Sequence, residues 1–178
     1  MSNSASRKRA STQRRRQIRD KAQTLDEASP RFIADVMLGR LAKWLRIAGF
    51  DVLYSNRYTD EELIALSGSE SRILLSRDTR LLVRRGVRNF IYLESEKVSD
   101  QIRQIFLATH TTSLPNLLTR CLECNELLHD MPREEARDVV PPFVFKTQPG
   151  FKSCPRCRRI YWAGTHRQFV LRTLKSLL

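Results

Sequence analysis

Residues 31–50 have the sequence RFIADVMLGRLAKWLRIAGF, which combines an apolar run, a carboxylate and a helical pattern. The run Arg31–Asp35 is short and ends in the acid. The apolar residues after it recur at helical spacing and stop before Gly49, at Leu38, Leu41, Ala42, Leu45 and Ala48. The stretch predicts a β-strand that leads directly into an amphipathic helix.

The same strand-then-helix order recurs along the chain. Further strands are predicted at 50–55, 73–78 and 89–93. Thr59 and Glu62 predict a capping box at the start of one helix, and Ser99 is expected to cap another. Because parallel strands need crossovers of helical length, the predicted fold class is α/β, with a parallel sheet flanked by helices.

Three acids are placed where such a sheet binds ligands. Asp35 and Asp78 end the first and third predicted strands, and Asp60 lies in the first turn of a helix. Each alone is equally consistent with a helix cap or a favourable interaction with the helix dipole. Together, three neighbouring carboxylates would repel one another unless a hard cation lay among them, which favours Mg²⁺ or Mn²⁺.

The four cysteines form two C-x-x-C pairs, Cys121/Cys124 and Cys154/Cys157. Two-residue spacing is typical of zinc knuckles, so all four are predicted to hold one structural Zn²⁺. Because four thiolates leave no open coordination position, this site is expected to perform no chemistry. The alternatives are two disulfides or ordinary buried thiols.

The chain of 178 residues has a formal net charge of +13, with 32 Lys and Arg against 19 Asp and Glu. Residues 1–30 hold eight of the basic and three of the acidic side chains, with almost no large apolar residue. This segment is predicted to be a disordered basic arm. A basic arm on a basic domain favours a nucleic-acid partner over an acidic membrane surface.

The sequence also indicates a compartment. Met1–Asp20 has no apolar segment of the secretory type, and no run of about 18 apolar residues is present to span a membrane. The expectation is a soluble, cytoplasmic protein with reduced thiols and no membrane partner.

Basic residues near the acids are candidates for contacts to a nucleic-acid backbone, of RNA or of DNA. Arg40, Lys43 and Arg46 follow Asp35 on the predicted helix, and Arg77 and Arg80 flank Asp78. Near the second cysteine pair, Arg158 and Trp162 could contact phosphate and stack on a base. The alternative for Tyr161 and Trp162 is a small core of the zinc module, or one ring inside and one outside.

Several of these segments, taken in order, resemble the Mut7-C RNase domain family. The matching residues are IADVMLGRLAKWLR (33–46), AGFD (48–51), DEEL (60–63), ILLSRD (73–78) and the paired cysteines that end in YWAGTH (161–166). The resemblance covers Arg31 to the C-terminus. It implies a PIN-like nuclease fold with a C-terminal zinc ribbon, RNA cleavage, and acidic roles for Asp35, Asp60 and Asp78.

On this basis the expected organisation is an arm at 1–30, a PIN-like nuclease domain at 31–112, a zinc ribbon at 113–166 and a helix at 167–178 that packs back. One departure stands out, since PIN nucleases usually have a fourth acid shortly after the position of Asp78. Here Thr79–Val83 contains none. Asp51, Glu62 and Glu94 are the possible substitutes.

The resulting hypothesis is a metal-dependent endoribonuclease, a hydrolase that cleaves single-stranded or structured RNA and uses catalytic Mg²⁺ or Mn²⁺ beside structural zinc. The alternative is a noncatalytic RNA- or ribosome-binding protein, in which the ribbon and the arm bind and the acids are structural. A phosphatase or receiver-type phosphoacceptor is a third class. It is disfavoured because Asp35-Val36-Met37 lacks the second aspartate that aspartyl phosphatases use.

Overall fold

The computed structural model describes residues 10, 12–14, 17, 30–164 and 167–178. The predicted basic arm therefore lies almost wholly outside the described residues, as does His166. Within the described residues, no helix is both long enough and apolar enough to cross a membrane.

The described chain from residue 30 onward alternates strands and helices, as the sequence patterns predict. The elements are β1 (Arg31–Ala34), the 3₁₀ turn η1 (Val36–Leu38), α2 (Gly39–Ile47), β2 (Asp51–Tyr54), α3 (Asp60–Ser69), β3 (Ile73–Ser76), α4 (Thr79–Leu82), β4 (Phe90–Tyr92), α5 (Val98–Ala108), β5 (His129–Met131), α6 (Arg133–Ala136), α7 (Pro142–Thr147), β6 (Phe151–Ser153), β7 (Ile160–Trp162) and α8 (Arg167–Lys175).

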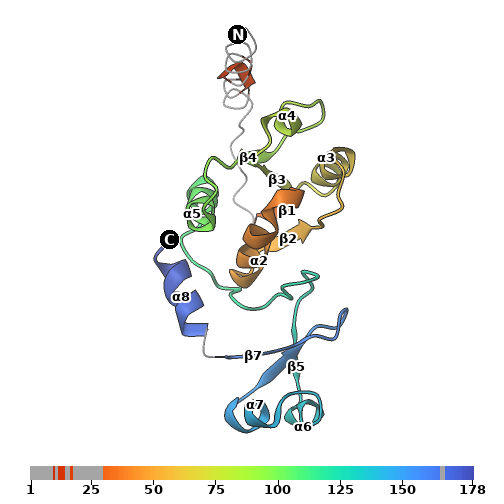
Figure 1. Cartoon of the computed structure of the whole chain (residues 1–178), viewed down its shortest axis with the longest axis vertical. Coiled ribbons are helices and arrows are strands. Elements are labelled where there is room, and N and C mark those ends of the chain that lie inside the picture. The colour runs from red at the N-terminus through yellow and green to blue at the C-terminus, as the bar shows by residue number, and fades with distance from the viewer. Residues whose placement is uncertain (1–9, 11, 15–16, 18–29, 165–166) are drawn as a thin grey trace, which may run out of the picture.

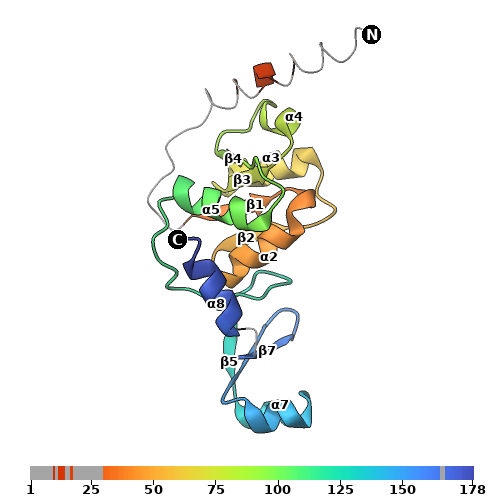
Figure 2. The same cartoon turned by 60° about the vertical axis from the view of Figure 1, so that its left-hand side comes forward.

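Strands β1 to β4 form one parallel sheet in the order β2-β1-β3-β4. The chain passes from β1 outward to β2 and then crosses back to β3 on the other side of β1. The carboxyl ends of β1 and β3 are therefore adjacent at the point where the strand order reverses, which is where open α/β sheets bind ligands. Figures 1 and 2 show this sheet between its helices.

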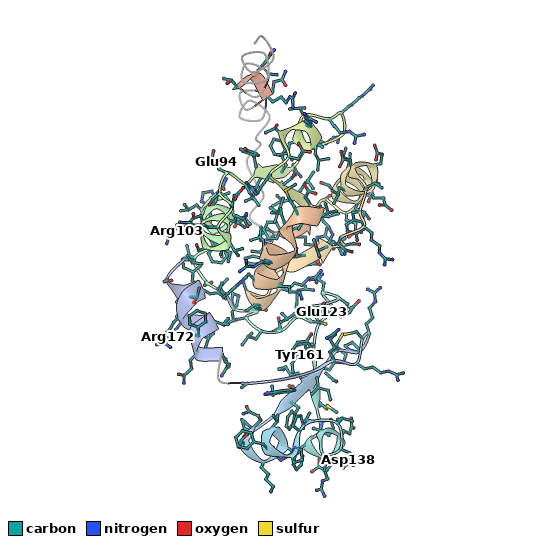
Figure 3. The ribbon with its side chains drawn as sticks, viewed as in Figure 1. Glu94, Arg103, Glu123, Asp138, Tyr161 and Arg172 are labelled. Atoms are coloured by element: carbon teal, nitrogen blue, oxygen red, sulfur yellow. The ribbon has the colours of Figure 1, made fainter. Side chains whose placement is uncertain are left out.

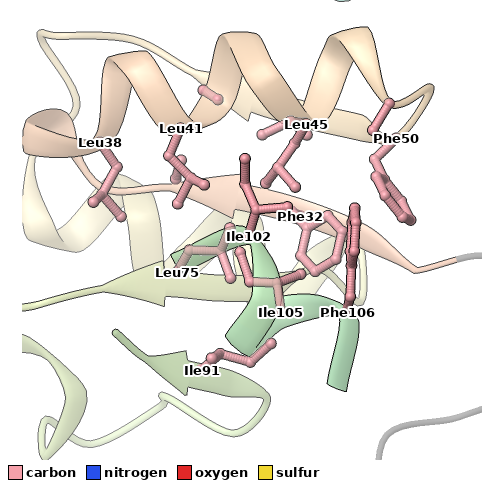
Figure 4. Packing of buried hydrophobic residues seen from close by; sticks show 14 of the residues in the cluster. Phe32, Leu38, Leu41, Leu45, Phe50, Leu75, Ile91, Ile102, Ile105 and Phe106 are labelled. Atoms are coloured by element: carbon pink, nitrogen blue, oxygen red, sulfur yellow. The ribbon is translucent and has the colours of Figure 1, made fainter. Parts of the chain in front are cut away.

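The alternation of side chains along each strand divides the core into two layers. Phe32 and Leu75 point to the layer covered by α2, α5 and α8, where Leu174 of α8 is also buried. Figure 4 shows part of this layer, with Phe32, Phe50 and Phe106 close together. Ile33 and Leu74 point to the opposite layer, which α3 and α4 cover. The result is a three-layer α/β/α core with the sheet buried on both faces.

The second half of the chain forms a smaller unit around the antiparallel sheet β5-β6-β7, and we call residues 129–162 of this unit the ribbon. Phe151 of β6 packs with Ala136 and Val140 in a core of its own. Figure 1 shows this unit below the parallel sheet, with α8 returning beside α5 and α2. We refer to residues 119–128, which contain the first cysteine pair, as the first knuckle.

Two local predictions are wrong. The apolar residues of segment 139–146 predict an extended strand with Pro141 and Pro142 at its start, but α7 occupies most of this segment. Pro142 at the first helical position favours a helix start, and Val144 and Phe145 then pack on the Phe151 core. Ser99 does not cap α5, which begins one residue earlier, at Val98, with Lys97 at the cap position.

Candidate active site and metal centre

Asp35 and Asp78 lie at the same edge of the parallel sheet. Asp35 directly follows β1, and Asp78 follows β3 by two residues. The two strands pair in register, and the Asp35 backbone N–H donates to the Leu75 carbonyl at 3.0 Å. The fold therefore places these two acids next to each other at the switch point, as their positions in the sequence predict.

Ser76, the last residue of β3, connects the two acids. Its hydroxyl is fully buried and donates to Asp35 Oδ2 at 2.6 Å, while its Oγ accepts from the Asp78 backbone N–H at 2.9 Å. Asp35 Oδ1 also accepts from the Val36 N–H at 2.6 Å, and the residue is only 5% exposed. The two hydrogen bonds therefore hold the Asp35 side chain in one orientation. Asp78 Oδ1 accepts from the Arg80 N–H and so caps α4. Each aspartate is thus a helix or turn cap and retains oxygen lone pairs for a further ligand.

Asp60 is the first residue of α3 and lies within the Thr59/Glu62 capping box that the sequence predicts. Its Oδ2 forms an ion pair with Arg84 Nη1 at 3.0 Å, and Arg84 also pairs with Glu61. The hydrogen bonds from Glu61 and then Asp60 raise the pKa of Arg84. The Asp60 carboxylate is therefore held by a cation of the chain itself.

The three acids do not form a closed ligand set. Among the described residues, the only group of three or more His, Cys, Asp or Glu side chains with ligand atoms within 4.8 Å of one another is the four cysteines. Asp35 and Asp78 offer the carboxylate oxygens that Mg²⁺ or Mn²⁺ prefers, whereas the Asp60 carboxylate is engaged by Arg84.

The possible substitutes for a fourth acid occupy three different places. Asp51 begins β2 and so lies at the opposite edge of the sheet, where Arg72 Nη1 donates to it at 2.7 Å. Glu62 accepts from Thr59 in the capping box. Glu94 is exposed and follows β4, whose carboxyl end lies beside that of β3. Of the three, Glu94 follows a strand end at the edge that holds Asp35 and Asp78, whereas Glu62 lies in the first turn of α3 with Asp60 and is used in its capping box.

The basic residues near the acids differ in how exposed they are. Arg40, Lys43 and Arg80 are exposed, and Arg77 is half-buried. Lys43 pairs with Glu123, and Arg77 pairs with Glu96. Arg46 is only 3% exposed, and its guanidinium donates to the backbone carbonyls of Val52, Leu122 and Glu123. Burial lowers the pKa of Arg46. Arg46 is therefore placed inside the fold and not on the surface where an RNA contact was expected.

The four cysteines meet in one cluster, as their spacing predicts, and could hold a zinc ion. Neighbouring sulfur atoms are 3.3 to 3.5 Å apart, for Cys124–Cys154, Cys121–Cys124 and Cys121–Cys157. A tetrahedron with Zn–S bonds of about 2.3 Å requires sulfur separations of about 3.8 Å, so a small outward shift accommodates the ion. No disulfide links these cysteines.

Tyr161 supports this cluster from β7. The Leu122 N–H donates to the phenolic oxygen at 3.2 Å, and the hydroxyl in turn lies 3.1 Å from Cys121 Sγ. Burial by itself raises the pKa of the Cys121 thiol, but the Tyr161 hydrogen bond and neighbouring N–H groups outweigh it and lower that pKa to about 6. The thiolate that zinc requires is therefore favoured at this position.

The first knuckle is bound tightly to the parallel-sheet domain. Asn125, just after Cys124, accepts from the Val52 N–H at the open edge of β2 and donates to Asp51 at 2.8 Å. Arg46 donates to the Leu122 and Glu123 carbonyls from the last turn of α2. We call these contacts of Arg46, Asp51 and Asn125 the knuckle latch. The cysteine cluster thus lies at the C-terminal end of α2, while the acids lie at its N-terminal end.

Arg158 and Trp162 are both exposed on the ribbon, and Trp162 retains 41% of its accessible surface. Tyr161 is half-buried and points to the cysteines, so one aromatic ring lies inside and one outside.

Sequence reasoning missed Ser76, Arg84 and Asn125, and it considered Tyr161 without its hydrogen bond at the cysteine cluster. A serine two residues before a strand-end aspartate was a usable signal for Ser76, because Ser side chains commonly bond the backbone two residues on. No local pattern predicted Arg84, whose partner Asp60 is 24 residues away in the sequence, or Asn125, whose partner Asp51 is 74 residues away.

Comparison with known proteins identifies the family. The family model for the Mut7-C RNAse domain matches residues 30–174, which include the parallel sheet, the cysteine cluster and most of α8. Searches of curated proteins and of solved structures found no match to this chain. Since the matched region is most of the sequence, the chain belongs to the Mut7-C RNAse domain family.

Proposed function

We propose that this protein is a metal-dependent endoribonuclease with a PIN-like nuclease domain. The observation that carries the proposal is the pair Asp35 and Asp78, linked by Ser76 at the switch point of the sheet. The name of the family supports RNA as the substrate and hydrolysis as the reaction.

In this proposal Asp35 and Asp78 hold Mg²⁺ or Mn²⁺ through their remaining oxygen lone pairs. The ion, when bound, would lower the pKa of a water molecule and neutralise charge on the scissile phosphate. Asp60 completes the site through water, or directly once Arg84 moves to another anion. Because no side chain of this chain is needed as a nucleophile, the expected products carry 5′-phosphate and 3′-hydroxyl ends.

Arg84 gains a role in this arrangement. It neutralises Asp60 and Glu61 beside the site, and a phosphate of the RNA would offer it an alternative partner. Exchange of Asp60 for phosphate would free the carboxylate when substrate arrives. Arg40 and Arg80 are exposed near Asp35 and Asp78, and we assign them to the RNA backbone.

The noncatalytic alternative is less well supported. It treats Asp35 and Asp78 as structural caps, which they also are. However, the noncatalytic alternative gives no reason why one serine should hold both aspartates at the switch point of the sheet. The name of the family does not favour this alternative either. Ribosome association through residues 1–30 and a cytoplasmic location remain proposals that rest on the charge and composition of the chain.

The experiment is a cleavage assay with a circular single-stranded RNA and a linear RNA of the same sequence. The zinc-loaded protein is incubated with each in Mg²⁺ or Mn²⁺, and the product ends are identified by their reactivity with phosphatase and ligase. Cleavage of the circle to products with 5′-phosphates supports the proposal. Cleavage of the linear RNA alone would mean an exonuclease, and 2′,3′-cyclic ends would exclude a metal-activated water.

A further inference from the structure

A hollow of about 580 Å³ lies between the first knuckle, the ribbon sheet and α8, in the size range of ligand sites. Figure 3 labels Tyr161 on β7 and Arg172 on α8, two of the elements that bound the hollow. Its walls are mainly apolar and come from separate elements, among them Ile47, Leu117, Leu122, Leu128 and Val170. No role described above uses this space.

The lining suits a flat ring that carries a charged backbone. Tyr161 and Trp162 both line the hollow, and the Tyr161 ring is held rigidly because its oxygen is bonded at Leu122 and Cys121. Bases of single-stranded RNA stack on such rings, whatever their sequence. Tyr161 is already committed to the cysteines, so the exposed Trp162 ring is the freer stacking surface.

The rim of the hollow is basic. Arg120, Lys152 and Arg167 line it, and Lys152 pairs with Asp130 of the same lining at 2.7 Å. Arg120 lies 4.0 Å from Asp51 and donates to the Gly49 and Asn125 carbonyls, so Arg167 is the exposed cation of the three. Next to it the second cysteine pair carries the exposed Arg156, Arg158 and Arg159. This charge complements a polyanion and disfavours an apolar peptide as the occupant.

The hollow also lies on a direct route from the acids. Arg40, Lys43 and Ile47 follow one another at helical spacing on one side of α2, and Ile47 lines the hollow. The nine residues from Gly39 to Ile47 make eight steps along the helix and rise by about 12 Å, so an RNA strand laid along this side would connect the two places. Arg40 and Lys43 are exposed along it, and Lys43 pairs with Glu123 of the first knuckle at 2.9 Å.

We propose that the hollow between the first knuckle, the ribbon sheet and α8 is a base-binding subsite for single-stranded RNA. An unstacked base enters it, Trp162 stacks on the base, and Arg167 contacts the adjoining phosphate. The strand then runs along α2 to the acids, a step that rests on the proposed function. The zinc module thereby selects unpaired RNA a few nucleotides from the cleaved bond.

The test measures binding without cleavage. The zinc-loaded Asp35→Asn, Asp78→Asn protein is titrated into a fluorescently labelled single-stranded oligoribonucleotide, and anisotropy gives the Kd. The variants Trp162→Leu and Arg167→Ala are compared with two controls outside the hollow. Phe143→Leu removes an exposed aromatic ring from the same ribbon, and Arg172→Ala removes an exposed arginine from the same helix. Zinc content and circular dichroism confirm that each variant is folded.

We expect Trp162→Leu to weaken binding about tenfold, in line with the loss of one stacked base, and both controls to change it by less than about twofold. Arg167→Ala should make the slope of log K against log salt shallower by about 0.7, the value for one phosphate contact on a single strand. An unlabelled competitor of the same length without bases should displace the labelled RNA from the protein with Trp162 much less well than unlabelled RNA does. From the Trp162→Leu variant, the two competitors should displace it equally well.

If the base-free oligomer displaced the labelled RNA from the protein with Trp162 as well as unlabelled RNA does, the proposed base-binding subsite would be wrong. A loss of affinity in Phe143→Leu as large as that in Trp162→Leu would also overturn it. These outcomes are separate from the fate of the nuclease proposal, which is read from cleavage by the chain with its acids intact. Base-dependent binding without any cleavage would keep the subsite and reject the catalysis.

Discussion

At the scale of single residues, the site depends on a buried serine. Ser76 donates to the Asp35 carboxylate and accepts from the Asp78 backbone N–H, so one hydroxyl orients the first acid and holds the backbone of the second. Outer hydrogen bonds of this kind orient metal ligands and raise affinity for the ion. The distance in sequence from Asp35 to Ser76 is 41 residues, yet adjacent strands place them in contact.

Replacing Ser76 tests this directly. Ser76→Ala should reduce metal-dependent RNA cleavage about 10- to 100-fold, because Asp35 Oδ2 loses the donor that orients it. Ser76→Thr, which keeps the hydroxyl, should retain most of the activity. The readout is the Mg²⁺ concentration for half-maximal cleavage, which should rise in Ser76→Ala. An unchanged metal requirement in Ser76→Ala would show that the serine has only a structural role.

Asp51 predicts a pH dependence of stability. Burial alone raises the pKa of Asp51, but the hydrogen bonds from Arg72 and Asn125 outweigh it and hold that pKa below its ordinary value of 3.8. A carboxyl with a lowered pKa in the folded state stabilises the fold above its ordinary pKa, and this contribution is lost as the pH falls through the lowered value.

Asp51→Asn should therefore reduce the free energy of unfolding by about 2 kcal/mol at pH 7, measured by urea titration. The gap between the variant and the parent should narrow as the pH falls below about 4. A gap that stays constant from pH 7 to pH 3 would mean that Asp51 is not ionised in this network.

At the scale of elements, the turn after α2 is set by a glycine. Gly49 has φ +97°, and a Cβ there would lie 2.1 Å from the Asn116 carbonyl oxygen. Both the backbone conformation and the closeness of residues 116–118, which pack on the end of α2, exclude a side chain. This turn joins α2 to β2 and thus links the helix after Asp35 to the edge strand that the first knuckle covers.

Gly49→Ala should lower the free energy of unfolding by about 3 kcal/mol, because it adds a clash with backbone to a strained φ. The control is Gly68→Ala in α3, where a Cβ would meet nothing within 4 Å. This change should stabilise the protein by about 0.5 to 1 kcal/mol. If thermal unfolding gave the same small change in the free energy of unfolding for both variants, Gly49 would not be packed as closely against Asn116 as described.

Elements with strong local patterns could be predicted from the sequence. The four parallel strands and the α3 capping box follow from apolar runs and from Thr59 and Glu62. Segment 139–146 could not be predicted, because its apolar residues fit a strand as well as a helix. The choice was made by Pro142 together with the packing of Phe145 on Phe151, a residue outside this segment.

The candidate site was predictable to the same extent. Positions at strand ends identify Asp35 and Asp78, and spacing identifies the four cysteines, since both depend on local sequence. The ion pair of Asp60 with Arg84 and the burial of Arg46 depend on tertiary contacts, which no local pattern contains.

At the scale of the whole molecule, the two units are coupled through the knuckle latch. Arg46 and Asn125 join the first knuckle to α2 and β2, and Cys121 lies beside them. Structural zinc supplies folding energy to its module, so the ion should stabilise this junction as well as the ribbon.

Removal of zinc should therefore affect more than the ribbon. With chelator, amide hydrogen exchange should speed up in residues 119–128 and 151–162 and, to a lesser degree, in the last turn of α2. Exchange in β3 and β4 should change little, because their contacts lie in the parallel-sheet core. Loss of protection in the ribbon with none at residues 45–47 would contradict the coupling.

The most direct test of the account is the RNA cleavage rate of the double variant Asp35→Asn, Asp78→Asn in saturating Mg²⁺ or Mn²⁺, with zinc content and fold verified. The control is Glu134→Gln, Asp138→Asn, which removes two exposed acids from the ribbon. We expect the first variant to lose cleavage by at least about a hundredfold while RNA binding persists, and the control to cleave like the parent. Equal rates for all three proteins would contradict a carboxylate-metal site at the switch point of the sheet.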